Sequence, residues 1–341
     1  MGGRRRFNLR QSEKKAIGGM VLEKNIEIEP TSELLSWYYL NKRDLPWRET
    51  SDPWLILLSE IILQQTQVSR GLQYWIRIST RFPTPKSMAT SDVEELLSLW
   101  QGAGYYARAR RLHALSVLVS KRKSDGGYDG EIPSSVDELL KLPGIGPYTA
   151  SAVASIAFGV PSPVVDGNVK RVSSRILAIE SPSTNTLRTW AGSMLDPKRA
   201  GDSNQALMEL GAIVCRPKSP KCELCPMTRW CLGIENPESY PSKKKMRRLT
   251  EELDAAVLID PYGRPFLTKR EDNGRFGGMW GPPMNDIDTT SMLNVGKITH
   301  ELSHRKLIVS VWTGDCDIGT DPKTVPISNL DRKILDMAFA I

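Results

Sequence analysis

The hydrophobic and polar positions follow a helical pattern between residues 31 and 215. Signals that begin helices repeatedly precede runs of apolar residues in this part of the chain. Capping boxes and an aspartate followed by proline both satisfy the free backbone amides of a first helical turn. These signals are Asp52-Pro53, Ser91-x-x-Glu94 and Ser135-x-x-Glu138. The pattern predicts a region that is mostly α-helical.

The pattern changes near residue 254. Short runs rich in β-branched and aromatic residues follow, and a turn sequence at 260–263, DPYG, joins the first two. The runs are 255–260, 264–269 and 306–312. This pattern predicts a small region that is α+β or mainly β.

Residues 236–252 separate the two patterns and are typical of a linker. They contain Pro237, Pro241 and the run KKKMRR at 243–248. A chain of 341 residues is expected to form about two domains. The predicted division is a basic tail at 1–30, a helical domain at 31–235, a basic linker at 236–252 and a smaller domain at 253–341.

Charge is spread unevenly along the chain, whose net charge is +7. Residues 1–15 hold six Lys and Arg against Glu13, and residues 243–248 hold five basic residues and no acidic one. Residues 249–341 hold ten basic and fourteen acidic residues. On charge alone, such runs are better explained as solvated tails or a nuclear address, and a polyanion partner is the alternative.

Composition excludes several classes of protein. With 40% hydrophobic and 25% charged residues, the chain is neither disordered nor collagen-like nor a coiled coil. No apolar run approaches the about 18 residues that cross a membrane, and the first 15 residues are too polar for a secretory signal. We expect an intracellular protein that is soluble. The sequence does not decide between nucleus, mitochondrion and bacterial cytoplasm.

Four of the five cysteines lie in one short segment directly after an apolar helical run. Four thiolates in one loop suit a zinc ion or an iron–sulfur cluster, and their spacing leaves both open. Cys316 stands apart in the β-rich region and is expected to be a small core residue. The clustered residues are Cys215, Cys222, Cys225 and Cys231.

Gly144 and Gly146 lie in the string LPGIGPYTA (142–150), between two predicted helices. Glycines let a ligand approach the backbone closely, and the amides at the next helix start can hold a phosphate. The string predicts a helix-hairpin-helix clamp on a DNA backbone. A glycine-rich turn between two packed helices is the structural alternative.

Two acidic residues stand in apolar surroundings. Glu60 lies in the run LSEIILQQTQV (58–68), where burial is expected to raise its pKa and keep it available as a proton donor. Asp166 follows an apolar run in VVDGNVKRV (164–172) and could serve only as a helix cap. The sequence alone does not show that the two carboxyl groups meet.

Together these strings resemble the MutY family of adenine DNA glycosylases, within the endonuclease III superfamily of helix-hairpin-helix glycosylases. They occur in the order typical of that family over nearly all of residues 31–235. The matching strings are RDLPWR (43–48), LSEIILQQTQV (58–68), GYYARARRL (104–112), LPGIGPYTA (142–150), VVDGNVKRV (164–172), NQALMELGAIVC (204–215) and the four-cysteine loop at 215–231.

The resemblance implies a fold and a cofactor. The fold is an all-α glycosylase domain of two helical subdomains, one with the hairpin and one with a [4Fe-4S] cluster, followed by a small α+β domain. The four clustered cysteines are the implied ligands, so the resemblance favours the cluster over zinc. The partner that it implies is double-stranded DNA, bound by a monomer.

The resemblance also implies a reaction in base excision repair. An adenine mispaired with 8-oxoguanine or guanine is flipped out of the duplex, and its N-glycosidic bond is hydrolysed. Glu60 matches the general acid that protonates the base, and Asp166 matches the carboxylate that stabilises the oxocarbenium-like sugar. Tyr148 stands where bifunctional relatives have a lysine, which predicts a monofunctional enzyme. Lys170 is expected to contact a phosphate.

Further DNA contacts follow residue by residue. Gln65 and Tyr105, with Thr66 adjacent, match residues that wedge into the duplex beside the lesion. Ala103 is smaller than the leucine expected at its position. Residues that match the adenine pocket are Arg43, Leu45, Trp47, Arg48 and Gln205.

Residues 253–341 resemble the NUDIX-like domain by which the family recognises 8-oxoguanine. The strings are GMWGPP (278–283) and HELSHRKL (300–307). Ser303 and His304 are the candidates for contact with the lesion, and Leu302 replaces an aromatic residue common in the family. No NUDIX box is visible, so pyrophosphatase activity is not expected.

Three other functions compete with this one. A mismatch-specific thymine glycosylase of the same superfamily usually lacks the C-terminal domain. An endonuclease III-like enzyme is disfavoured by Tyr148. A damage-binding protein without catalysis is disfavoured by the presence of both Glu60 and Asp166.

Overall fold

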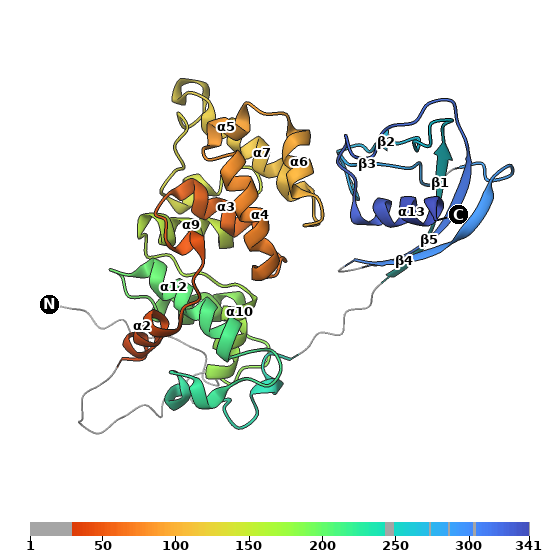
Figure 1. The fold of residues 1–341 in the computed structure, drawn as a ribbon. Helices are drawn as coiled ribbons and strands as arrows, with labels where there is room; N and C mark the ends of the chain where they lie inside the picture. The colour runs from red at the N-terminus through yellow and green to blue at the C-terminus, as the bar shows by residue number, and fades with distance from the viewer. Residues whose placement is uncertain (1–28, 243–248, 273, 286, 303–304, 341) are drawn as a thin grey trace, which may run out of the picture. The chain divides into compact units, whose positions relative to one another are not determined.

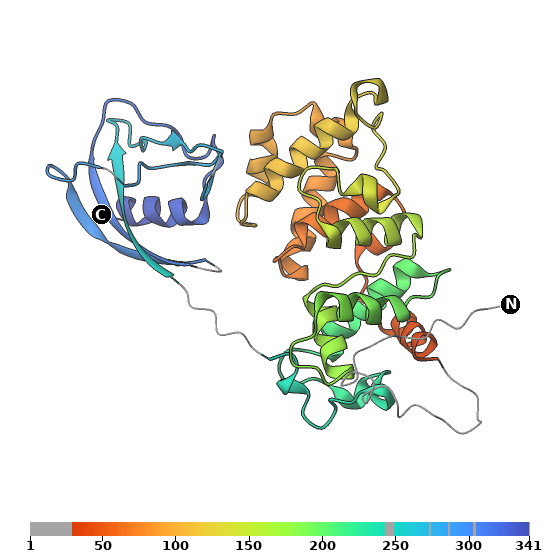
Figure 2. The same ribbon diagram turned by 180° about the vertical axis from the view of Figure 1, so that it is seen from behind.

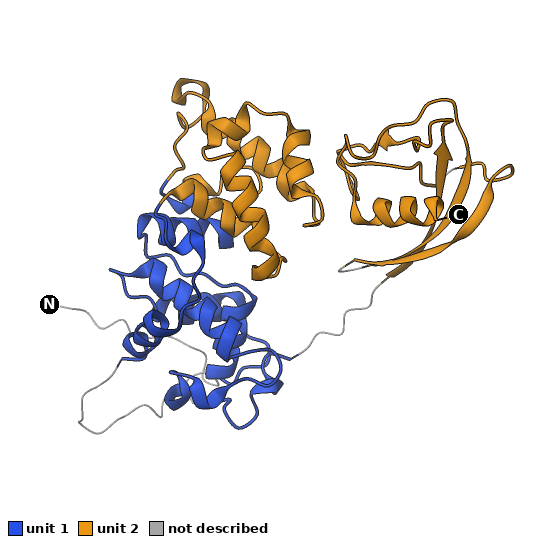
Figure 3. Cartoon of the chain, viewed as in Figure 1, with its two compact units in different colours: residues 1–51, 134–137, 147–243 blue, residues 52–133, 138–146, 244–341 orange. Residues whose placement is uncertain are grey.

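The computed structural model describes residues 29–242, 249–272, 274–285, 287–302 and 305–340. The chain forms two compact units, and each unit combines segments that are distant in the sequence (Figure 3). Unit 1 comprises residues 1–51, 134–137 and 147–243, and unit 2 comprises residues 52–133, 138–146 and 244–341.

The region predicted to be helical is helical throughout. Its elements follow one another with short connections. Its α-helices are α2 (Pro30–Asn41), α3 (Pro53–Ile62), α4 (Val68–Arg81), α5 (Pro85–Ala89), α6 (Val93–Trp100), α7 (Ala107–Ser120), α8 (Val136–Leu139), α9 (Pro147–Phe158), α10 (Gly167–Ile176), α11 (Thr184–Ser193) and α12 (Ala200–Glu209). Its single-turn helices are η1 (Pro46–Arg48), η2 (Lys123–Asp125), η3 (Leu210–Val214), η4 (Cys222–Leu224), η5 (Thr228–Trp230) and η6 (Pro237–Ser239).

Two of the predicted helix starts are decided by the structure, with different outcomes. The cap at Asp52 is confirmed, because its carboxylate accepts a hydrogen bond of 2.8 Å from the backbone amide of Trp54. The capping box at Ser91 is wrong. Asp92 caps α6 instead, and the Ser91 hydroxyl donates to the carbonyl of Met88 at the end of the preceding helix. Ser91 therefore belongs to the end of α5 and Asp92 to the start of α6, because the polypeptide turns between the two helices.

Unit 1 is built on the packing of α2, α10 and α12, which are labelled in Figure 1 and lie together in the view from behind as well (Figure 2). Leu34 and Leu35 of α2 pack in one core with Val169 of α10 and Leu207 of α12. All four are fully or almost fully buried. Burial of side chains of this size stabilises a fold by about 1.5–3 kcal/mol each. The core therefore fixes the chain segments that precede and follow the expected site residues of this unit.

The helical part of unit 2 surrounds α3, which is apolar on nearly every face. Ile56, Leu57 and Leu58 of α3 are completely or almost completely buried, as is Trp100 at the end of α6. A helix that is apolar all round belongs in the interior of its domain. Glu60 is the one acidic residue of α3 and is carried into this interior with it.

The C-terminal region of unit 2 is a small sheet covered by one helix. Three strands have the order β1-β5-β4, in which β1 runs parallel and β4 antiparallel to β5, and β2 and β3 form a separate antiparallel pair. Figure 1 shows α13 against the long strands. The elements are β1 (Leu249–Ile259), β2 (Thr268–Lys269), β3 (Trp280–Gly281), β4 (Leu293–Glu301), β5 (Arg305–Asp315) and α13 (Asn329–Phe339).

The predicted strands are recovered in part. The runs 255–260 and 306–312 fall almost entirely within β1 and β5, whose buried valines share a core with α13. Of the run 264–269, only the two residues of β2 form a strand. The reason is that β1 pairs along its length with β5, and its contact with this run is the isolated β-bridge between Ile259 and Pro265. In the described part of the chain, no helix has the length and apolar character to span a membrane.

Candidate active site and cysteine loop

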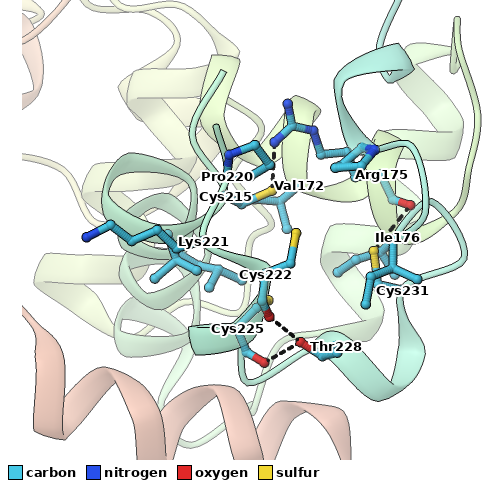
Figure 4. A pocket seen from close by; sticks show the side chains of 14 residues that line it. Val172, Arg175, Ile176, Cys215, Pro220, Lys221, Cys222, Cys225, Thr228 and Cys231 are labelled. Atoms are coloured by element: carbon cyan, nitrogen blue, oxygen red, sulfur yellow. Dashed lines mark hydrogen bonds between the residues drawn. The ribbon is translucent and has the colours of Figure 1, made fainter. Parts of the chain in front are cut away.

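The four clustered cysteines line one pocket in unit 1. Figure 4 shows their sulfur atoms around it, with Val172 and Ile176 of α10 among the apolar residues of its wall. All four are free thiols. The Arg175 guanidinium lies 3.3 Å from the sulfur of Cys215, and the Thr228 hydroxyl donates to the carbonyls of Cys222 and Cys225. The loop is thus held around its thiols by Thr228 of the loop itself and by Arg175 of α10.

The described thiols do not form a compact metal-binding group. Among the described residues, no three or more Cys, His, Asp or Glu side chains are grouped so as to hold a metal ion. Four cysteines are the usual ligands of iron–sulfur clusters. Burial raises the pKa of the Cys225 thiol to about 11, so that a thiolate there requires a positive neighbour.

Asp166 is positioned as the N-cap of α10. One carboxylate oxygen accepts from the amide of Val169 at 2.6 Å, and the other accepts from the side-chain amide of Asn168 at 2.8 Å. Burial raises the pKa of Asp166, while these hydrogen bonds oppose the shift. The role as a cap does not exclude chemistry, because the cap fixes the direction of a half-buried carboxylate.

A buried amide that the sequence analysis missed supports the segment before Asp166. Asn204 of α12 accepts from the amide of Val164 and donates to the carbonyl of Ser162 and to the Ser155 hydroxyl, with distances of 2.8–3.0 Å. The Asn204 side chain is completely buried. It ties three segments of unit 1 together, and only its place in the matching string NQALMELGAIVC could have indicated it.

Arg43 and Arg48 share a carboxylate that sequence reasoning also missed. Glu209, at the end of α12, accepts from the Arg43 guanidinium at 2.7 and 2.8 Å, from the Arg43 amide at 2.9 Å and from the Arg48 guanidinium at 2.8 Å. The side chain of Glu209 is 1% exposed and that of Arg48 8%. Burial alone would raise the pKa of Glu209, but the hydrogen bonds from both arginines lower it to about 2. The carboxylate is therefore fully ionised at neutral pH.

The remaining expected pocket residues lie in the same unit. Leu45 and Trp47 lie between Arg43 and Arg48 along the chain and are each 7% exposed. Gln205 is half-buried on α12. Tyr148, in the first turn of α9, donates a hydrogen bond of 3.5 Å to the sulfur of Met208. Unit 1 therefore holds most of the residues expected to surround the base.

Glu60 belongs to unit 2, whereas Asp166 belongs to unit 1. Glu60 is 8% exposed within α3, which agrees with the burial expected from its apolar surroundings. A raised pKa for this carboxyl stays a prediction.

Both expected wedge residues have an unusual backbone conformation. Gln65 has φ of 58° and Tyr105 has φ of 49°, values that non-glycine residues rarely adopt. Gln65 is exposed, and Tyr105 is 45% exposed although it is a large aromatic residue. Such conformations cost of order 1–3 kcal/mol and persist where the surroundings enforce them, frequently at functional sites.

The two hairpin glycines have different requirements. Gly144 has φ of 82°, and a Cβ atom there would lie 2.8 Å from the Cβ of Arg111 on α7. At Gly146 the backbone is unstrained, and a Cβ atom would meet no heavy atom within 4 Å. The fold itself therefore demands glycine at the first position only. The surface at the second is left open.

Three other candidate residues add little to this geometry. Lys170 is exposed on α10, one turn after Asp166. Ser303 and His304 lie outside the described residues.

Comparison with known proteins gives one family. The model of the HhH-GPD superfamily of base excision DNA repair proteins matches residues 58–191. The adenine DNA glycosylase of Homo sapiens is 31% identical over 379 residues, covering 86% of this chain and 68% of that protein. The adenine DNA glycosylase of Mycolicibacterium smegmatis is 43% identical over 204 residues, covering 58% of this chain and 68% of that protein.

Solved structures share the helical fold. A thermostable thymine-DNA glycosylase superposes with a TM-score of 0.55 at 30% identity, covering 60% of this chain and 94% of that chain. A trapped covalent intermediate of endonuclease III with DNA superposes with a TM-score of 0.52 at 26% identity, covering 60% of this chain and 93% of that chain. These neighbours place the described helices in a glycosylase fold, to which this chain adds a small C-terminal sheet region.

Proposed function

This chain belongs to the adenine DNA glycosylase family, and we propose that it hydrolyses the N-glycosidic bond of an adenine mispaired with 8-oxoguanine or guanine in double-stranded DNA. One observation carries the proposal: the relation to the human adenine enzyme covers 86% of this chain, a share that includes part of the C-terminal region. The thymine-DNA glycosylase is matched over 94% of its own length yet covers 60% of this chain. A thymine-DNA glycosylase of that length therefore does not account for the C-terminal region of this chain.

Glu60 is the general acid of the proposed reaction. Undamaged adenine is a poor leaving group, so it must be protonated as the glycosidic bond breaks. Burial in α3 supports this role, because a carboxyl group in apolar surroundings is favoured in the protonated form. Once the base has left, the same carboxylate accepts a proton from the attacking water.

Asp166 stabilises the positive charge that develops on the sugar. Its carboxylate is oriented by Val169 and Asn168, and an oriented charge needs no rearrangement when the oxocarbenium-like state forms. Tyr148 offers a phenol where bifunctional relatives have an amine. We therefore infer a monofunctional glycosylase, in which water and not the protein attacks the sugar.

Contacts with DNA divide between the two units. The open backbone at Gly146, beside the fixed turn at Gly144, is suited to a phosphate that approaches the hairpin, and Lys170 supplies a further phosphate contact. Gln65 and Tyr105, with Thr66 beside them, wedge into the duplex as the adenine leaves the stack. The flipped base is read by Gln205 and enclosed by Leu45 and Trp47. Arg43 and Arg48 act there in the orientation that Glu209 gives them.

The cysteine pocket is the proposed site of a [4Fe-4S] cluster. Cys215, Cys222, Cys225 and Cys231 hold it, and the Arg175 guanidinium beside Cys215 offsets part of the negative charge of the thiolates. Such a cluster supplies a rigid, charged centre for the loop that carries it. Iron and sulfide analysis of the purified protein, with a Cys225→Ser variant as the control, tests this assignment.

The C-terminal region, residues 253–341, is the proposed NUDIX-like reader of 8-oxoguanine, through Ser303 and His304. The proposed domains are otherwise those expected from the sequence, with a helical glycosylase domain at 31–235. The protein acts as a monomer inside the cell, where its DNA lies.

The test is single-turnover release of the base from three duplexes, with adenine opposite 8-oxoguanine, adenine opposite guanine, and thymine opposite guanine. We expect rapid release of adenine from the first duplex and a loss of orders of magnitude in Glu60→Gln. Glu95→Gln, at a residue of α6 whose side chain is 39% accessible, is the matched control and keeps the rate. Release of thymine would favour the mismatch enzyme, and binding without turnover would favour a damage-binding protein.

A further inference from the structure

One arginine contacts both loops that carry the expected wedge residues. Arg108 lies in the first turn of α7, and its guanidinium reaches the end of α3 and the loop after α6. On the first side it donates to the carbonyls of Ile61, Ile62 and Gln64, at 2.9, 3.1 and 2.5 Å. The last of these acceptors is the residue directly before Gln65.

On the second side the same guanidinium meets the loop of Tyr105. It lies 3.4 Å from the carbonyl of Ala103 and 3.3 Å from that of Gly104, the residue directly before Tyr105. It also lies 3.4 Å from the Thr66 hydroxyl, beside Gln65. Each left-handed residue thus follows a carbonyl that Arg108 holds.

The charge of Arg108 is balanced by dipoles. In the described part of the chain, no carboxylate lies within 4.0 Å of this guanidinium to form an ion pair. Ile61 and Ile62 end α3, and carbonyls at a helix C-terminus carry partial negative charge. The rings of Trp100 and Tyr105 lie 5.1 and 5.8 Å away and attract a cation through their faces. Burial lowers the pKa of Arg108 only to about 10, so it stays charged at neutral pH.

We propose that Arg108 is a positioning residue for base flipping: its guanidinium holds Gln65 and Tyr105 in their left-handed conformations before DNA arrives. A planar guanidinium has five donors in a fixed fork and can join two backbone segments in this way, whereas the compact ammonium of lysine cannot span both. The loops of Gln65 and Tyr105 then need no further ordering when they insert into the duplex. The base is therefore unstacked against a surface that is already formed. This inference rests on the proposed wedge role of Gln65 and Tyr105.

The experiment separates base flipping from chemistry. Adenine release is measured under single-turnover conditions on two duplexes, one with adenine opposite 8-oxoguanine and one with adenine opposite an abasic site, where flipping requires no base pair to be broken. The Arg108→Lys variant should release adenine from the paired duplex at least about tenfold more slowly than wild type. A tenfold change in rate corresponds to about 1.4 kcal/mol, which lies within the cost of holding one residue in a strained conformation. Its rate on the unpaired adenine should fall by much less. A fluorescent 2-aminopurine beside the target should report slower unstacking.

Arg77→Lys is the matched control. Arg77 is exposed on α4 and stacks on the ring of Tyr74 at 4.2 Å, so the same exchange should leave both rates unchanged. Equal slowing of Arg108→Lys on both duplexes, or no slowing, would overturn the proposal. In a Gln65→Ala background, Arg108→Lys should cost less than it does alone, because both changes affect one device. Additive costs would also overturn it.

Gly104→Ala provides a second approach should Arg108→Lys fail to fold. Gly104 has φ of 74°, and a Cβ atom there would meet no heavy atom within 4 Å, so the change disfavours the loop conformation without a clash. The proposal expects the same selective slowing on the paired duplex, and its absence would count against it. If the wild-type protein releases adenine from neither duplex, the proposed function itself fails, which is a separate result.

Discussion

Two arginine sites, one in each unit, have their charges balanced in different ways. In unit 1, Arg43 and Arg48 share one carboxylate, Glu209, through charge-assisted hydrogen bonds. Among the described residues of unit 2, carbonyls, a hydroxyl and aromatic faces surround the Arg108 guanidinium. A carboxylate fixes its partners at one point and carries a charge that responds to acid. Backbone dipoles join separate segments and do not titrate.

This difference predicts how each region fails. Removal of one member of a buried ion pair leaves an uncompensated charge, which is among the most costly single changes in a protein. Removal of a guanidinium from a set of carbonyls leaves acceptors without donors, which costs less because carbonyls tolerate partial satisfaction better than a charge does. Substitutions at the two sites separate these cases.

Glu209→Gln should lower the free energy of unfolding by about 3–5 kcal/mol, because it leaves the guanidinium of Arg48 buried without a counter-charge. Denaturant unfolding followed by circular dichroism measures this loss. In an Arg48→Met background, Glu209→Gln should lower the free energy of unfolding by clearly less, because the Arg48 guanidinium that it would leave unpaired is absent. A loss below about 1 kcal/mol in the wild-type background would show that water replaces the carboxylate.

Acid should remove part of the same stabilisation. The pKa of Glu209 is about 2 in the folded chain, below its ordinary value of 4.5, so its contribution is complete above about pH 4.5 and is lost as pH falls toward 2. The difference in stability between wild type and Glu209→Gln should therefore shrink over this range. Unfolding curves at several pH values check this, and a constant difference would contradict the assigned pKa.

Arg108→Met should cost about 1–3 kcal/mol, a smaller loss than that of Glu209→Gln. The reason is that it leaves several carbonyls without their donor but no unpaired charge. The difference from wild type should stay constant between pH 7 and 4.5, because no carboxylate is its partner. Arg77→Met, at an exposed site of the same unit, should stay within about 0.5 kcal/mol. A stability difference between wild type and Arg108→Met that changes strongly with pH would contradict the claim that backbone dipoles balance the charge of Arg108.

Glu95→Gln should have the smallest effect, at most about 1 kcal/mol. Glu95 pairs with Arg81 across an exposed surface, where 39% and 49% of the two side chains are accessible. Water and salt screen such a pair, so the loss should fall further at high ionic strength. A loss as large as that of Glu209→Gln would mean that burial does not govern the cost of a broken pair in this protein.

Prediction from sequence succeeded best where a residue acts on its own segment. Asp52 caps α3 because its side chain reaches an amide two residues away, and the apolar run around Glu60 carries that residue into the interior. The runs that became β1 and β5 were visible because strands within a core need apolar residues whatever they pair with. The capping box at Ser91 failed because two adjacent residues can supply the same cap, and the turn between α5 and α6 selected Asp92.

Pairings between residues far apart in the chain cannot be predicted from local sequence patterns. The parallel register of β1 with β5 joins residues more than fifty positions apart and leaves 264–269 with only a short strand. Arg108 reads in sequence as one of several basic residues on an exposed helix face, and nothing local marks it as the contact between two loops. The left-handed conformations of Gln65 and Tyr105 were equally hidden, since neither residue is a glycine.

Local sequence patterns predict the helical and sheet-forming regions, the cysteine loop, the hairpin glycines and the residues at which the chemistry is proposed. These features depend on residue type and local spacing, which follow from short-range sterics, hydrogen bonds and burial. It took the three-dimensional fold to show that Glu209 holds Arg43 and Arg48, that Asn204 supports the segment before Asp166, and that Arg108 joins two strained loops. Those arrangements arise because a buried polar group must find a partner, and the fold alone determines which partner is within reach.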